Sequence, residues 1–86
     1  MPVSCNAISD TILTLTSARG MGKTICPSEV ARHLSPEDWR PLMPHIRKIA
    51  LSLQSQGLIR ITQAGQDVDP VVVHGPIRLG VQPHSN

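Results

Sequence analysis

The segment Gly20-Met21-Gly22-Lys23-Thr24 ends in the way that a nucleotide-binding phosphate loop ends. The complete loop pattern also needs a glycine five residues before the second glycine, and Ser17 occupies that position. It further needs a strand before the loop and a helix directly after it, whereas here a helical pattern precedes and Pro27 follows within three residues. We therefore interpret the segment as a turn and expect no ATP or GTP binding.

Histidine and cysteine side chains are the second group that could do chemistry. None of them has the close paired spacing of a zinc site, so we expect no metal ion and no cofactor. Cys26 precedes a predicted helix, which can lower the pKa of a thiol, but the sequence places no base beside it. We expect it to pack as a small apolar residue, and we expect a protein that is not an enzyme. The residues concerned are Cys5, Cys26, His33, His45, His74 and His84.

Basic and polar side chains form a third group, which suits contact with a polyanion. Between Trp39 and Gln66 the chain has four Lys or Arg residues and no Asp or Glu, although its formal net charge is only +2. One helix and the strand after it would share this positive charge. Four such charges predict a slope of about −4 when log affinity for DNA is plotted against log salt. The candidate DNA-binding residues are Arg40, Arg47, Lys48, Ser52, Arg60 and Gln63.

Two helices are predicted in the first half of the chain. Ile8, Ile12 and Leu15 have the spacing of one helical stripe, which predicts a helix from about Asn6 to Arg19. Proline suits the first position of a helix, because the amide hydrogen that it lacks has no partner there. The second predicted helix therefore runs over Pro27–Leu34.

The third predicted helix carries most of the basic group and runs from about Pro41 to Gln56. Pro41 and Pro44 blur its start, so we expect a separate turn over Glu37–Arg40. Trp39 is expected to fill the gap between the second and third helices, because the core has no other aromatic residue. The apolar face of the third helix comprises Leu42, Met43, Ile46, Ile49, Ala50 and Leu53.

The strands are predicted from short runs that are rich in β-branched residues. Lys23–Cys26 is expected to be a brief edge strand, and Leu58–Gln63 a longer strand followed by a turn over Ala64–Gln66. Pro70 interrupts Val68–Val73, which makes that segment a loop or an edge, and Ile77–Leu79 can return as the last strand.

This order of elements predicts an α+β winged helix-turn-helix, in which the third helix can lie in a DNA groove and the hairpin loop forms the wing. Three helices would pack against a small antiparallel hairpin or three-stranded sheet. We expect one domain over residues 1–80 and a disordered tail over residues 81–86.

Composition excludes several classes of function. No apolar run approaches the ~20 residues that span a bilayer, and no secretory signal is visible, so we expect no membrane association. Two cysteines are too few for a disulfide framework, which favours the reducing cytoplasm. One Trp, with no Phe or Tyr, argues against proteins that bind single strands by stacking bases on aromatic side chains.

The sequence also resembles a small, mainly bacterial family of domains of unknown function with a predicted winged-helix fold. The resemblance covers roughly Ile8 to Leu79 and implies the fold but no activity. The residues that carry it are Trp39-Arg40, Leu42-Met43, Ile61-Thr62-Gln63, Val68-Asp69-Pro70 and Gly75-Pro76-Ile77-Arg78.

Duplex DNA binding, with a role in transcriptional regulation, is the leading interpretation of the basic group. The alternative is a protein-interaction module or homodimer, because winged helices also dock proteins and a fold does not fix a function. Asp67 and Asp69 would repel phosphates near a wing. Leu51, expected on the exposed side of the third helix, and Val71-Val72-Val73 would suit a protein contact. A solvated face that only keeps the domain soluble is equally compatible with these charges.

Overall fold

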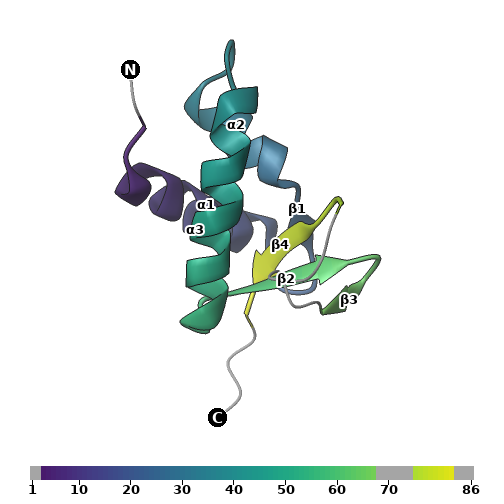
Figure 1. Cartoon of the computed structure of the whole chain (residues 1–86). Helices are drawn as coiled ribbons and strands as arrows, with labels where there is room; N and C mark the ends of the chain where they lie inside the picture. Colours follow the sequence, from purple (N-terminus) through teal and green to yellow (C-terminus); the bar gives the residue numbers. More distant parts are fainter. Residues whose placement is uncertain (1–2, 68–74, 83–86) are drawn as a thin grey trace.

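The computed structural model describes residues 3–67 and 75–82 of the chain. Three helices pack together, and a small antiparallel sheet lies beside them (Figure 1). This architecture confirms the predicted α+β class and is compatible with a winged helix-turn-helix. In chain order the elements are α1 (Cys5–Arg19), β1 (Thr24–Ile25), α2 (Pro27–Leu34), the short 3-10 helix η1 (Arg40–Leu42), α3 (Met43–Ser55), β2 (Ile59–Gln63), β3 (Gln66–Asp67) and β4 (Arg78–Val81).

The sheet has the strand order β1-β4-β2-β3, and every pair is antiparallel. Ile25, Leu79 and Ile61 lie opposite one another in a single row and are buried against the helices. Because successive side chains of a strand point to opposite faces, the residues next to this row face away from the helices. We call that surface the outer sheet face; it consists of Thr24, Arg60, Thr62, Asp67, Arg78 and Gly80.

The core is almost entirely aliphatic and draws on all three helices and on β1, β2 and β4. Trp39 is half-buried and packs against this core, as the sequence predicts. Each helix buries only one stripe, and among the described residues no helix is long and apolar enough to cross a membrane. The buried apolar residues are Ile8, Ile12, Ile25, Val30, Ala31, Ile46, Ala50, Leu53, Ile59, Ile61, Ile77 and Leu79.

Local signals set the ends of the first two helices. The Ser4 hydroxyl accepts a hydrogen bond from the Ala7 amide at 3.0 Å, which lets α1 begin at Cys5, one residue earlier than predicted. Pro27 occupies the first turn of α2. The Glu29 carboxylate reaches back to accept from the Cys26 amide at 2.7 Å, so the predicted bounds of α2 are confirmed.

The single third helix that the sequence predicts is divided in two. The 3-10 helix η1 comes first, and α3 starts only at Met43. Pro44 has no amide hydrogen to donate to the Arg40 carbonyl, so an α-helical bond cannot form there. The Met43 amide donates to that carbonyl instead and tightens the turn. The separate turn predicted over Glu37–Arg40 is therefore displaced toward α3.

The C-terminal strands also differ from the prediction. Gln66 pairs with Gln63 and begins β3, so the turn has only two residues, Ala64 and Gly65. Both have positive φ, 53° and 82°, as the tightest hairpin turns require. The last strand is shifted to Arg78–Val81, and Val81 pairs with Ile59. The predicted tail boundary at residue 81 is therefore wrong, and residues 83–86 lie outside the described residues.

Candidate nucleic-acid interface

The exposed side of α3 is positioned by the buried stripe of the same helix. Ile46, Ala50 and Leu53 are buried, which leaves Lys48 and Ser52 one turn apart on the solvent side. Arg47 lies on the flank and is half-buried, and the exposed Arg40 precedes the helix in η1. We call Arg40, Arg47, Lys48 and Ser52 the helical basic face.

Two predicted site residues bind the segment that enters β4, one from the helical basic face and one from β2. Arg47 Nη1 donates to the Gly75 carbonyl oxygen at 3.1 Å, across 28 positions of sequence. Gln63 Nε2 donates to the adjacent Pro76 carbonyl oxygen, also at 3.1 Å. Both residues were predicted to contact DNA. Arg47 connects the segment before β4 to α3, and Gln63 connects it to β2. Residues 68–74, which include Asp69, His74 and the three valines, lie outside the described residues.

Arg40 is held over the face of Trp39, with its guanidinium carbon 4.7 Å from the ring centroid. Arg32 from α2 lies 4.6 Å from the same centroid. The ring is an attractive surface for both cations, because its faces carry partial negative charge. Trp39 thus both packs against the core and fixes the position of Arg40 at the start of the helical basic face.

Arg60 does not belong with the α3 residues, contrary to the prediction of one shared surface. It projects from the outer sheet face, and its Nε and Nη2 lie 3.0 and 2.8 Å from Asp67 Oδ1. The pair exists because the two-residue turn folds β3 back on β2. The sequence analysis treated Asp67 only as a charge that repels phosphate, whereas in the structure it neutralises Arg60.

The helical basic face is left with three cations that have no carboxylate partner. Within residues 3–67 and 75–82, the ion pairs are Arg19–Glu29 and Arg60–Asp67, and neither includes Arg40, Arg47 or Lys48. Ser52 is exposed, and its hydroxyl accepts a hydrogen bond from Gln56 Nε2 at 3.2 Å. Leu51 is half-buried, so the expectation that it is exposed on this side is wrong.

The glycine-lysine turn joins α1 to β1, which confirms its interpretation as a helix-to-strand turn. Gly20 and Gly22 have φ values of 99° and 77°, which only glycine adopts readily. The Lys23 amide donates to the Gly20 carbonyl oxygen at 3.2 Å. One of the amides that a phosphate loop would turn toward its ligand is therefore used within the turn.

The thiols and histidines are dispersed. Cys5 is exposed, Cys26 is half-buried, and both are free. The Ser28 hydroxyl lies 3.0 Å from the Cys26 sulfur, a contact between neighbours at the start of α2. Over the part of the chain that the structure describes, no three His, Cys, Asp or Glu residues lie close enough together to hold a metal ion.

A second basic region, which was not predicted from the sequence, is organised by Thr24. Its carbonyl oxygen accepts from Arg19 Nη1 at 3.1 Å and from Arg78 Nη2 at 3.2 Å, and its hydroxyl accepts from Arg78 Nε at 3.0 Å. The Cys26 amide, followed by Arg19 and Arg78, lowers the pKa of Glu29 below its ordinary value of 4.5. Thr24 and Arg78 are 54 positions apart, so only the pairing of β1 with β4 brings them together.

Comparison with protein families gives one match. The model of the family described as a protein of unknown function (DUF3253) matches residues 5–82, and the chain belongs to this family. No curated protein matches it. The resemblance to a family of domains of unknown function is thereby confirmed. Because the family description names no activity, the function has to be inferred from the geometry.

Proposed function

We propose that this protein binds duplex DNA through the helical basic face. The observation that carries the proposal is that Arg40 and Lys48 on the exposed side of η1 and α3, and Arg47 on its flank, have no carboxylate partner among the described residues. Leaving several cations unpaired along one helix favours a partner that supplies a row of negative charges. The phosphates of a DNA strand are such a row.

The neighbouring elements support the same proposal. A helix with an exposed side fits the major groove, and in winged helices the segment after the second strand reaches the backbone beside it. Arg47 holds Gly75 next to α3, where a wing would have to lie, and Gln63 ties the adjacent Pro76 to β2. A regulatory role in the cytoplasm is part of the proposal, and two free thiols suit a reducing compartment.

The ion pair of Arg60 changes the expected strength of binding. Arg60 faces away from α3 and is held by Asp67, so three cations rather than four remain for phosphates. The slope of log affinity against log salt should therefore be about −3. Contacts that are mainly electrostatic predict a dissociation constant on the order of micromolar at moderate salt, as for sequence-independent binding.

Fluorescence anisotropy of a labelled duplex, titrated at several salt concentrations, tests the proposal. Lys48→Ala should flatten the slope by about one unit, because Lys48 is exposed and lies outside the core stripe. Arg47→Ala combined with Lys48→Ala should flatten it by up to about two units and weaken binding to every sequence. Part of that effect will come from the lost Arg47–Gly75 bond, so Lys48→Ala alone is the cleaner variant.

Lys23→Ala is the matched control, because it removes an exposed lysine that lies outside the helical basic face. It should leave the slope unchanged. Absence of binding at low salt, or equal effects of Lys23→Ala and Lys48→Ala, would sink the proposal. The protein-docking alternative would then be the better explanation, although no large apolar side chain is exposed on α3, all of which the structure describes. The exposed large apolar residues in the described chain are Met21 and Leu58, which lie outside α3.

A further inference from the structure

The outer sheet face contains a hollow of about 250 Å³. Gly80 is one of its lining residues and pairs with Thr24 on one side and with Arg60 on the other. A Cβ atom on Gly80 would lie 3.1 Å from the Lys23 carbonyl oxygen and 3.3 Å from Thr24 Cγ2. The close approach of β1 therefore leaves little room for a side chain here, and a glycine within a strand often marks a place where a ligand comes near the backbone.

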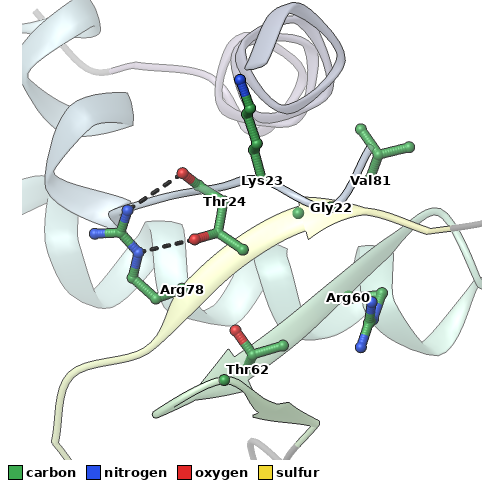
Figure 2. Close-up of a pocket in the computed structure, with 9 residues that line it drawn as sticks. Gly22, Lys23, Thr24, Arg60, Thr62, Arg78 and Val81 are labelled. Atoms are coloured by element: carbon green, nitrogen blue, oxygen red, sulfur yellow. Dashed lines mark hydrogen bonds between the residues drawn. The ribbon is translucent and has the colours of Figure 1, made fainter. Parts of the chain in front are cut away.

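Basic and hydroxyl side chains surround this hollow. Arg78 and Thr62 are register partners on β4 and β2, and Arg60 is the partner of Gly80 on the same two strands. Figure 2 shows Arg78, Thr62 and Arg60 around the hollow. Three cations line the hollow, and the one acid among the described residues of the outer sheet face, Asp67, is the partner of Arg60. The hollow therefore keeps a positive field. Its charged and hydroxyl-bearing lining residues are Lys23, Thr24, Arg60, Thr62 and Arg78.

Arg78 is the fixed donor of this group. Two of its nitrogens are bound to Thr24, as the dashed lines in Figure 2 show, and the third points outward from that contact. A guanidinium that is already ordered loses less conformational entropy when it binds an anion. It also presents its remaining N–H groups in a planar geometry that suits oxyanions.

The other two cations can adjust to a ligand. Lys23 is exposed, and Figure 2 shows its side chain extending away from the sheet on a flexible stem. The side chains of Arg60 and Asp67 are 36% and 68% exposed, and ion pairs that water reaches this easily contribute little. A doubly charged anion in the hollow can therefore compete with Asp67 for Arg60.

We propose that the hollow binds a single phosphate group carried by a small molecule. Pockets for drug-sized ligands and cofactors begin at about 300 Å³, so a hollow of 250 Å³ takes one tetrahedral anion rather than a whole nucleotide. Arg78 would donate to the phosphate oxygens, and Lys23 and Arg60 would balance its charge. This site faces away from α3, so the inference does not rest on DNA binding.

The test is a titration of isotope-labelled protein with inorganic phosphate, followed by amide NMR and matched for ionic strength with chloride. Saturable shifts are expected at Thr24, Thr62 and Gly80, with a dissociation constant on the order of millimolar. Lys23→Gln should weaken binding about threefold, since one flexible surface charge is lost. Asp67→Asn should tighten it about threefold, because the internal competitor of the phosphate is removed.

Arg78→Gln should weaken phosphate binding most, but it also removes the bonds to Thr24, so Lys23→Gln and Asp67→Asn keep the test independent of folding. Lys48→Gln is the matched control on α3 and should have no effect. Equal shifts with chloride, or equal weakening by Lys23→Gln and Lys48→Gln, would overturn the inference.

Two phosphate sources are separated by further titrations. Phenyl phosphate, a small monoester, should shift the same amides as inorganic phosphate. If a short DNA duplex instead shifts these amides and Lys23→Gln weakens the duplex complex, the phosphate belongs to DNA and the small-molecule inference is wrong. If the duplex does not bind to α3, the proposed DNA binding is wrong. The inference that the hollow binds phosphate would still hold.

Discussion

The helical basic face has three cations, and three cations also line the hollow of the outer sheet face, yet the two groups differ in how their cations are held. Within the described residues, Arg40, Arg47 and Lys48 have no carboxylate partner, and they follow one another along η1 and α3. On the outer sheet face, Arg60 is paired with Asp67 and Arg78 is bound to Thr24 around a hollow. The same number of charges thus forms a row along η1 and α3, which we call the track, and a compact group around the hollow, which we call the cluster.

This difference suggests different partners for the two surfaces. A track of unpaired charges matches a linear polyanion, because each charge can meet a separate phosphate. A cluster with internal partners matches a compact anion, because the anion can replace the internal carboxylate and use donors that are already ordered. Net charge alone, which is only +2, would not reveal either surface.

The largest expected effect would remove both surfaces together, because they share one core. Leu79 is fully buried between Ile25 and Ile61, directly behind the outer sheet face. Leu79→Ala should lower the free energy of unfolding by about 2–5 kcal/mol, through lost burial and the cavity left behind. Urea unfolding followed by the fluorescence of the single tryptophan measures this change.

Leu58→Ala provides the control for that experiment. Leu58 is 44% exposed, so its truncation should change the free energy of unfolding by about 0.5 kcal/mol or less. If Leu79→Ala costs no more than Leu58→Ala, the sheet is not packed against the helices as described. If Leu79→Ala abolishes one binding activity while the protein stays folded and the other activity persists, the two surfaces do not depend on a common core.

The helical basic face was largely predictable, because its signals are local in the sequence. The period of the apolar residues in α3 places Ile46 and Leu53 inside and Lys48 outside without reference to any other element. The bounds of α2 were predicted from Pro27 in the same way. The interruption before Met43 was missed, since two prolines so close together can begin a helix in more than one way. The partial burial of Leu51 was missed as well.

The outer sheet face could not be predicted, because it depends on which strands pair and in which register. Arg78 meets Thr24 only when β4 lies beside β1. Arg60 meets Asp67 only because Ala64 and Gly65 make a two-residue turn. The longer turn that was expected would not pair these two residues, so the ion pair was not predicted. A shift of one residue would move every side chain of a strand to the other face.

A smaller effect is expected from Glu29, which anchors the edge of the sheet to α2 by way of Arg19. The pKa of Glu29 is lowered in the folded protein by the Cys26 amide and by Arg19 and Arg78, so its stabilising effect is present above pH 4.5. The effect is lost as the pH falls through the lowered pKa. Because both side chains of the ion pair are partly exposed, we expect Glu29→Gln to cost about 0.5–1 kcal/mol at pH 7.

Urea unfolding of the two proteins at neutral and acidic pH measures this effect. The difference between the native protein and Glu29→Gln should shrink below pH 4.5, because the native carboxylate then becomes protonated as well. Asp10→Asn is the control, since Asp10 is exposed on α1 and forms no ion pair among the described residues. A difference that grows toward low pH would contradict the role assigned to Glu29.

The smallest effect on stability and on DNA binding is expected from Asp67→Asn, which distinguishes the two surfaces most directly. Loss of the exposed pair with Arg60 should cost only a few tenths of a kcal/mol, measured by urea unfolding. DNA affinity should change by less than about twofold at moderate salt, because Asp67 lies on the outer sheet face, while phosphate affinity should rise. Anisotropy and NMR titrations of the same preparation compare the two. A tenfold gain in DNA affinity would show instead that DNA reaches Arg60, and the two surfaces would then have to be regarded as one.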